Sequence, residues 1–368
     1  MFIAQSLGPS LNDLRPLKPV VAAGSQEKGQ FPVYPDLQSL MASPAVEHPD
    51  PTIAHAMAVA TTYAYASVPG FCEEPDTLAR IMARMGMPSN RTLMVADRVD
   101  ASFIVSSGFL IQSDDGKVAI LAYRGTEPFT LANWLTDADI HSEQVTIDVG
   151  GEALTVHPGF YRNLRATRSP LIEAIDRACR GRSILDEDVE VEHPLEALYV
   201  TGHSLGGAMA ALMGLLILND PAYAEIKQRL RKVYTYGQPM IGPKSLGEAV
   251  TASGDEGKFI RFVYRNDVVP HLPPWGLGEY RHFGREFRAA RGDDGWTEAS
   301  RPTSQGPFFS IPMAPVEFLS RSLPVVRHLW FPYSLSDHLP LNYVEWLAPA
   351  GVASEYGDYV ASETSGIR

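Results

Sequence analysis

The sequence has 368 residues and a formal net charge of −12, with 45% apolar and 20% charged residues. This length allows one large domain or two small ones, and the composition is that of an ordinary globular protein. The acidic balance argues against nucleic acid as a partner and against an anionic membrane surface.

Cysteine content and segment hydrophobicity set further limits. The only cysteines, Cys72 and Cys179, are too few for a disulfide framework and cannot form a metal site by themselves. Residues 1–6 lack the basic start and long apolar core of a secretory signal, and the longest apolar run, 205–218, is too short to span a bilayer. We therefore expect a cytoplasmic protein with no integral membrane segment, although a removed signal or another export route would leave the same sequence.

The first 50 residues differ in composition from the rest. They are rich in proline, glycine and serine and keep no period of 2 or 3.6 for long. This pattern predicts an extended N-terminal arm lying on the main body. Residues 51–368 are predicted to form a single domain, which begins with helices at 53–66 and near 75–85.

Two β-hairpins are predicted next, each from a pair of apolar runs joined by a glycine-containing turn. Their strands are expected at 102–112, 117–123, 144–149 and 152–156. A long helix should follow and end near Arg180.

Strands and helices alternate in the second half of the chain. The strands are expected at 195–200, 233–236 and 258–264, and the helices at 208–218, 221–231 and 244–252. Such alternation predicts an α/β fold with a mostly parallel central sheet covered by helices on both faces.

A Gly-X-Ser-X-Gly motif lies between an apolar strand and a helix of small residues. It consists of Gly202, His203, Ser204 and Gly206, with Leu205 between the last two. A nucleophilic serine must project from a sharp strand-to-helix turn, where neighbouring backbone leaves no room for a Cβ two residues away on either side. The helix that follows directs its free N–H groups at the site. The alternative is a glycine-rich turn that only connects a strand to a helix, but the flanking elements favour a nucleophile elbow.

A serine nucleophile needs a histidine base, and the histidine needs a carboxylate. In chains with this elbow the acid follows the serine and the histidine comes last. The best acid is Asp267, just past the end of a predicted strand, where open α/β sheets place their sites. Its alternative role is that of a turn residue.

Four histidines follow the acid along the chain: His271, His282, His328 and His338. The first is too near the acid in sequence, the second lies in a predicted strand, and the third is surrounded by large apolar residues. His338 lies in a polar turn just before a helix-like run at 343–347, so we expect it to be the base.

The oxyanion of acyl transfer needs two N–H donors. One is expected from Leu205, directly after the nucleophile, and the other from a loop that follows an early strand. Thr126 lies in such a loop and could give both its N–H and its hydroxyl. It could equally be an ordinary turn threonine.

Taken together, these motifs resemble the class 3 lipase family, the fungal-type lipases and their bacterial relatives. The resemblance is carried, in the family's order, by residues 122–126 with 133–134, 156–160, 201–208, 236–239, and 266–267 with the late His338. It implies an α/β-hydrolase fold, a triad of Ser204, Asp267 and His338, and an oxyanion hole of Thr126 and Leu205. His157 would then be structural or lie near the site without a catalytic role.

Two apolar segments bear on the substrate. The resemblance implies a small lid helix near the oxyanion loop, at 127–135, whose apolar members Phe129, Leu131 and Trp134 would cover an acyl pocket; the alternative is an ordinary surface helix. The N-terminal arm has no counterpart in the family's motifs, and the connection from Asp267 to His338 is long, with an apolar insertion at about 290–333. Its part from 308 to 331 could wall the pocket, form a second cap, or pack passively on the domain.

The sequence therefore predicts a serine carboxylic-ester hydrolase, a lipase acting on acylglycerols or related acyl esters through an acyl-enzyme. No metal or cofactor is implied, and the expected partners are an ester substrate and a transient lipid–water interface. A short-chain esterase or a phospholipase of the same fold is the alternative. Acyl transfer to an alcohol and a catalytically silent binding module remain as further alternatives.

Overall fold

The computed structural model describes most of the chain. Its described residues are 1–14, 32–44, 47–66, 75–99, 104–126, 144–273, 279–289, 295–306 and 334–349. The predicted lid residues Phe129, Leu131 and Trp134, the apolar segment 308–331 and His328 lie outside these ranges.

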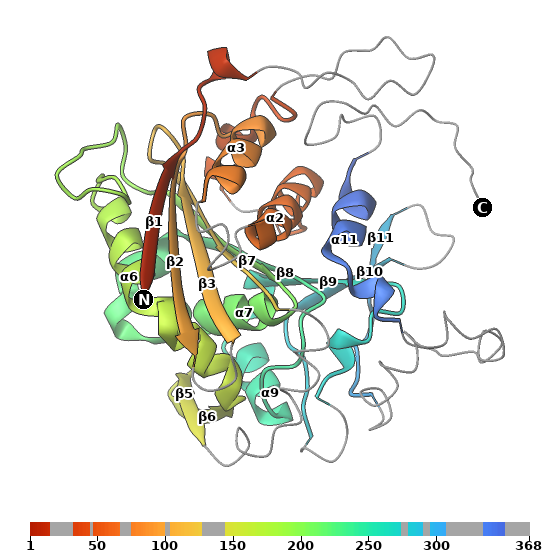
Figure 1. Ribbon diagram of the computed structural model, residues 1–368. Coiled ribbons are helices and arrows are strands. Elements are labelled where there is room, and N and C mark those ends of the chain that lie inside the picture. The colour runs from red at the N-terminus through yellow and green to blue at the C-terminus, as the bar shows by residue number, and fades with distance from the viewer. Residues whose placement is uncertain are drawn as a thin grey trace, which may run out of the picture.

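A nine-stranded sheet forms the centre of the molecule, in the order β1-β2-β3-β4-β7-β8-β9-β10-β11 (Figure 1). Its strands are β1 (Phe2–Leu7), β2 (Arg91–Val99), β3 (Ile104–Gln112), β4 (Val118–Tyr123), β7 (Ala197–His203), β8 (Leu230–Tyr236), β9 (Phe259–Tyr264), β10 (Arg285–Ala289) and β11 (Trp296–Glu298). The five strands from β4 to β10 run parallel, whereas β1 to β4 and the pair β10–β11 are antiparallel. The predicted α/β fold is confirmed, with antiparallel strands added at both edges.

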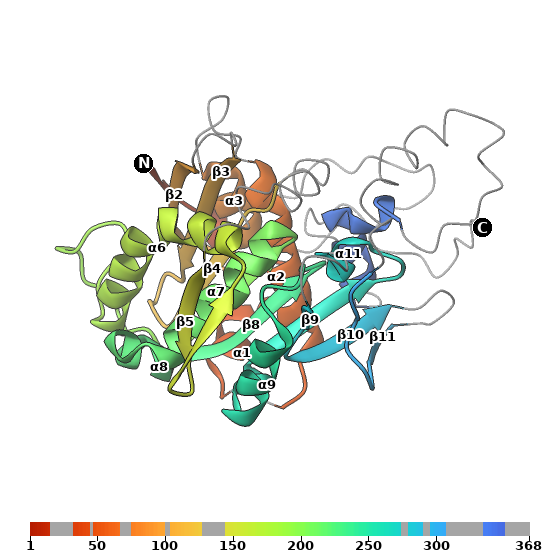
Figure 2. The same cartoon turned by 90° about the horizontal axis from the view of Figure 1, so that it is seen from below.

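Helices cover both faces of the sheet (Figures 1 and 2). One face carries α1 (Leu37–Ala42), α2 (Pro51–Tyr63), α3 (Asp76–Met85) and α11 (Pro340–Leu347), and the other carries α6 (Pro158–Cys179), α7 (Leu205–Asn219), α8 (Ala224–Arg229) and α9 (Lys244–Ala252). Each set encloses its own apolar core against the sheet. The hairpin of β5 (Val145–Val149) and β6 (Glu152–Val156) forms a separate two-stranded sheet, as predicted.

The helix starts follow from local sequence. The Asp50 carboxylate accepts hydrogen bonds from the N–H groups of Thr52 and Ile53, and Pro51 occupies the first turn of α2. Helix α7 is apolar around its whole circumference and is buried from Leu205 to Leu218. Within the described residues no single helix is long and apolar enough to cross a membrane. Helix α7 together with residues 221–229 has the length and composition of a membrane span, but the two parts are bent by 89° relative to each other.

The N-terminal region differs from the prediction. The described part of the expected arm includes β1, which pairs antiparallel with β2 at the sheet edge, and α1, whose Leu37 and Met41 are buried in the core. Both elements are six residues long, and their stability comes from tertiary pairing and packing, so the local pattern does not reveal them. Strand β2 was likewise not predicted, although it pairs along its length with β3.

Candidate active site

The Gly-X-Ser-X-Gly motif forms a sharp strand-to-helix turn at the carboxyl end of β7. Ser204 has φ of 60° and ψ of −128°, and α7 begins at the next residue. A Cβ on Gly202 would lie 2.0 Å from the Gly206 carbonyl oxygen, and one on Gly206 would lie 2.3 Å from the Tyr123 carbonyl oxygen. Both positions therefore require glycine, and the strained serine backbone is the geometry of a nucleophile elbow.

Asp267 and His338 lie in direct contact. Asp267 follows the end of β9, and His338 ends the 3₁₀ turn Ser336–His338 that precedes α11. The imidazole Nδ1 is 2.9 Å and 2.8 Å from the two carboxylate oxygens, and both side chains are buried. The carboxylate can only accept, so Nδ1 carries a proton, and in the neutral ring the other nitrogen, Nε2, keeps a lone pair.

Two further donors fix the carboxylate. The Tyr343 hydroxyl donates to Asp267 Oδ2 at 2.6 Å, and the Val269 N–H donates to Oδ1 at 2.9 Å. Tyr343 is fully buried, and burial together with the adjacent carboxylate raises the pKa of its phenol well above the ordinary value. The phenol therefore stays protonated and remains a donor, and its oxygen accepts a hydrogen bond from the Tyr264 N–H at 3.1 Å.

Ser204 lies beside this pair. The ring of His203, its chain neighbour, packs 4.5 Å from the ring of His338, and the Ser204 N–H donates to the Tyr236 carbonyl at 3.0 Å. Among the described residues, neither Ser204 Oγ nor His338 Nε2 has a hydrogen-bond partner, and both atoms are buried. The hydroxyl and the imidazole Nε2 are thus both uncommitted, and no hydrogen bond joins these two atoms in this structure.

The two expected oxyanion donors lie on segments that pack against each other at the elbow. Leu205 is the first residue of α7, so its N–H has no acceptor within the helix. Thr126 lies three residues past the end of β4, and the chain just after β4 packs against the start of α7: a Cβ on Gly206 would meet the Arg124 carbonyl carbon at 2.9 Å. The loop with Thr126 therefore leaves the sheet beside the elbow.

The other histidines considered from the sequence bond elsewhere. His271 Nδ1 faces the Ser304 carbonyl at 2.8 Å, and His282 Nε2 donates to the Pro270 carbonyl at 2.8 Å. His282 precedes β10, so its predicted place within a strand is wrong. His157 is buried at the start of α6, with its ring 4.4 Å from that of Phe160.

Three residues of this region were missed in the sequence. Gly237 has φ of 56°, and a Cβ there would lie 2.6 Å from Asp267 Oδ2 and 2.9 Å from the His338 ring. Residues 236–239 were named as part of the family resemblance, but no role was predicted for Gly237. Tyr343 and Tyr65 bear hydroxyls that reach the site from α11 and from the end of the α2 region, and no local pattern marks them.

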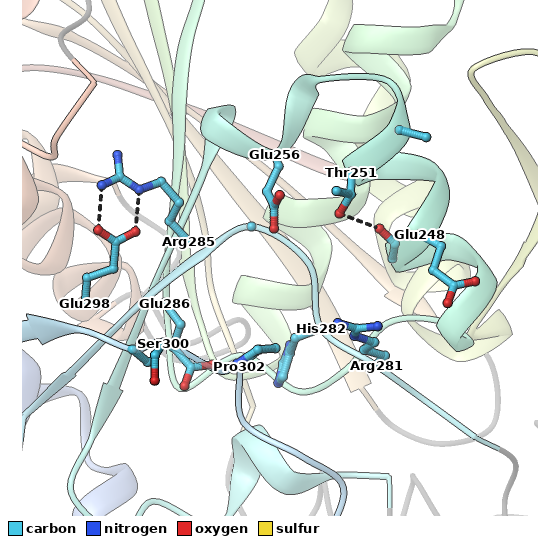
Figure 3. A pocket seen from close by; sticks show the side chains of 14 residues that line it. Glu248, Thr251, Glu256, Arg281, His282, Arg285, Glu286, Glu298, Ser300 and Pro302 are labelled. Atoms are coloured by element: carbon cyan, nitrogen blue, oxygen red, sulfur yellow. Dashed lines mark hydrogen bonds and ion pairs between the residues drawn. The ribbon is translucent and has the colours of Figure 1, made fainter.

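A pocket of about 550 Å³ lies elsewhere, between α9 and β10 (Figure 3). Six of its fourteen lining residues are charged, among them Glu248, Arg281 and Glu286, and the guanidinium of Arg285 pairs with the Glu298 carboxylate at 2.6 and 2.7 Å. None of the three predicted triad residues lines it. A charged surface of this kind does not suit an acyl chain.

A serine on a strained elbow, at the carboxyl end of a parallel strand and beside a buried carboxylate–histidine pair, defines an α/β-hydrolase. Residues 120–277 match the model of the family described as Lipase (class 3). The match covers 158 of the 368 residues and agrees with the resemblance that the motifs carry.

The relatives include enzymes from plants and fungi. The chain is 32% identical over 199 residues to the triacylglycerol lipase OBL1 of Arabidopsis thaliana, covering 48% of this chain and 38% of that one. It is 27% identical over 192 residues to the secreted mono- and diacylglycerol lipase A of Penicillium cyclopium, covering 52% and 54%. The matched region is therefore about half of these relatives' length or less.

Solved structures show the same fold. Lipase II from Rhizopus niveus has a TM-score of 0.51 at 22% identity, with 78% of this chain and 91% of that chain covered. The lipase from Rhizopus microsporus var. chinensis has a TM-score of 0.50 at 24% identity, with 78% and 84% covered.

Proposed function

We propose that this chain is a serine carboxylic-ester hydrolase that cleaves acylglycerols through an acyl-enzyme. The observation that carries the proposal is the buried Asp267–His338 pair, whose ring packs 4.5 Å from the ring of His203, the residue before the elbow serine. The match of residues 120–277 to the class 3 lipase family model supports the ester chemistry. The names of the relatives, which are lipases of tri-, di- and monoacylglycerols, support the substrate class.

In this mechanism His338 Nε2 takes the proton of the Ser204 hydroxyl as the oxygen attacks the ester carbonyl. The carboxylate of Asp267 holds the ring and stabilises its positive charge. The N–H groups of Leu205 and Thr126 hold the oxyanion, a donor type whose loss typically costs about 3 kcal/mol of transition-state stabilisation. His338 then gives its proton to the leaving alcohol, and water activated by the same nitrogen releases the acid.

The burial of Ser204 determines how the substrate preference should be tested. Ser204 is 0% exposed, so an ester reaches it only after part of the protein moves. A lipid surface that stabilises the moved arrangement would then raise activity. Hydrolysis of p-nitrophenyl esters should therefore be measured from short to long acyl chains, below and above the concentration at which the ester forms an emulsion.

A fluorophosphonate probe tests the nucleophile directly. The proposal expects labelling of the wild type at Ser204, mapped by peptide mass, and no labelling of Ser204→Ala. Folded wild-type protein that neither labels nor hydrolyses any ester would refute the enzyme and favour a silent binding module. Activity confined to soluble short esters would instead favour an esterase, and release of a fatty acid from phosphatidylcholine but not from acylglycerols would favour a phospholipase.

A further inference from the structure

A chain of hydrogen bonds that the reaction does not use runs from Tyr65 to the backbone of the base. The Tyr65 hydroxyl lies 2.9 Å from His203 Nδ1, and His203 Nε2 lies 2.8 Å from the carbonyl oxygen of His338. His203 is the residue immediately before the nucleophile, and its side chain is buried. One side chain thus connects the elbow to the turn that carries the base.

The direction of each bond follows from the groups involved. A carbonyl oxygen only accepts, so His203 Nε2 must carry a proton. Burial, and then the nearby His338 ring, hold the pKa of His203 well below its usual range, so the ring is neutral. Its Nδ1 is then an acceptor, and the Tyr65 hydroxyl is the donor. The chain of bonds therefore selects one tautomer of His203.

Side-chain packing joins the same residues. The rings of His203 and His338 are 4.5 Å apart and inclined by 32°, so His203 contacts both the backbone and the imidazole of the base. The Tyr65 hydroxyl also packs against the loop after β4, because a Cβ on Gly125 would lie 2.1 Å from it and 2.6 Å from the His203 carbonyl oxygen. Three segments of the site meet at these two side chains.

We propose that Tyr65 and His203 are positioning residues that hold His338 in register with Ser204. This inference rests on the proposed function, since it assumes that His338 is the base. Tyr65 and His338 both lie outside the family-model match at 120–277, and His203 lies inside it. The pair thus ties two flanking parts of the chain to the elbow within the matched region.

The expected defect is specific to proton transfer. A general base must lie within about 2.6–3.2 Å of the proton it takes, and a small misplacement is costly. If the His338 carbonyl loses its donor, the turn of Ser336–His338 can shift while the substrate contacts remain. The turnover number kcat should therefore fall, whereas KM should change little.

Two substitutions of His203 separate its two bonds. The side-chain amide that His203→Gln introduces can reach the place of Nε2 and donate to the His338 carbonyl. The shorter amide of His203→Asn matches Nδ1, so it can accept from Tyr65 but cannot reach that carbonyl. We expect His203→Gln to keep kcat within about threefold of the wild type and His203→Asn to lose about tenfold or more, with KM within about twofold in both.

Tyr65→Phe tests the other end of the hydrogen-bond chain. Without the hydroxyl donor, His203 can adopt the tautomer that no longer donates to His338, so we expect a loss of about threefold to tenfold in kcat. In His203→Asn the connection to His338 is already broken, so adding Tyr65→Phe should lower kcat no further. Equal effects of His203→Gln and His203→Asn, or additive effects of Tyr65→Phe and His203→Asn, would overturn the proposal.

A spectroscopic readout keeps this test independent of activity. In ¹⁵N-histidine NMR spectra of Ser204→Ala, whose His203 signal is assigned by its loss in His203→Gln, His203 should be the neutral Nε2–H form. The opposite tautomer would refute the positioning role even if no ester were hydrolysed. Conversely, fluorophosphonate labelling of the wild type and of His203→Asn at equal rates would refute it while leaving the proposed function intact. Should His203→Asn not fold, Tyr65→Phe and the NMR measurement decide the question.

Discussion

The Tyr343 hydroxyl offers a direct test of how the carboxylate is held. Tyr343→Phe keeps the buried ring and removes the 2.6 Å bond to Asp267 Oδ2, so that of the donors described above only His338 and the Val269 N–H remain. It also leaves the Tyr264 N–H without the acceptor it has at 3.1 Å. A hydrogen bond to a charged group contributes about 1.5–3 kcal/mol and an orphaned buried donor costs about 1–3 kcal/mol, so together we expect a loss of about 2.5–6 kcal/mol in the free energy of unfolding.

The same variant should lower catalysis. Losing the Tyr343 donor lets the carboxylate of Asp267 rotate, and the His338 ring turns with it. A loss of about tenfold in kcat/KM corresponds to about 1.4 kcal/mol, close to the lower value for one charge-assisted bond. Urea unfolding and p-nitrophenyl ester hydrolysis measure the two effects separately.

Tyr199→Phe is the matched control. Tyr199 is also a buried tyrosine, and its hydroxyl donates to the Met41 carbonyl at 3.0 Å. Removing it should lower stability by about 1 kcal/mol, while kcat/KM stays within about twofold of the wild type. If Tyr343→Phe loses stability but keeps kcat/KM as Tyr199→Phe does, the reasoning is refuted, because the Val269 N–H alone would then suffice to orient Asp267.

Three further predictions concern a close approach, a buried neutral histidine and a buried ion pair. Gly125→Ala should lower kcat/KM about a hundredfold, because its Cβ would lie 2.6 Å from the His203 carbonyl oxygen, so the elbow backbone must shift, as well as 2.1 Å from the Tyr65 hydroxyl; wild-type ester hydrolysis by this variant would contradict the packing. Burial lowers the pKa of His55 from 6.5 to about 4. The folded state therefore stays neutral while the unfolded chain binds a proton, and about 2 kcal/mol of stability should be lost as the pH falls from 6.5 to about 5. In urea titrations across this range His55→Asn should lack that part of the slope, and an unchanged slope would contradict the prediction. Burial alone would raise the pKa of Glu286, but the neighbouring Arg261 guanidinium lowers that pKa to about 2. Glu286→Gln leaves that guanidinium buried without its counter-charge and should cost about 3–5 kcal/mol in unfolding free energy; a loss below about 1 kcal/mol in urea unfolding would refute this.

The elbow could be predicted from the sequence because its constraints are local. Gly202 and Gly206 collide with backbone if given a Cβ, and the nearest atoms to Gly202 belong to residues four and five positions along the chain. The turn, its strand and its helix are therefore encoded within one local stretch, residues 197–219. The acid and the base were found by a weaker route, from chain order and from the polar turns that follow an apolar strand or precede the last helix.

The supporting contacts could not be predicted in this way. Tyr343 reaches Asp267 across 76 positions, and Tyr65 reaches His203 across 138. A tyrosine near the end of a helix has the same local pattern whether its hydroxyl meets water, a backbone carbonyl or a carboxylate. Only the tertiary arrangement of α2, β7 and α11 distinguishes these cases. The short β1 and α1 were missed for the same reason, since pairing with β2 and core packing hold them in place.

The elbow could be predicted and its supporting contacts could not, because the nucleophile and the base make different physical demands on the chain. The nucleophile needs strained backbone, and strain of that kind demands particular residue types close by in sequence. The base needs a fixed ring and a fixed tautomer, and these require only hydrogen-bond partners of the right kind, supplied from any part of the chain. His203 meets both demands, because it lies within the elbow motif while its side chain bonds to Tyr65 and to the backbone of His338. Substitutions of Gly202 or Ser204 disturb the elbow or remove the nucleophile itself. Substitutions of the His203 side chain should therefore separate the positioning of the base from the geometry of attack more clearly.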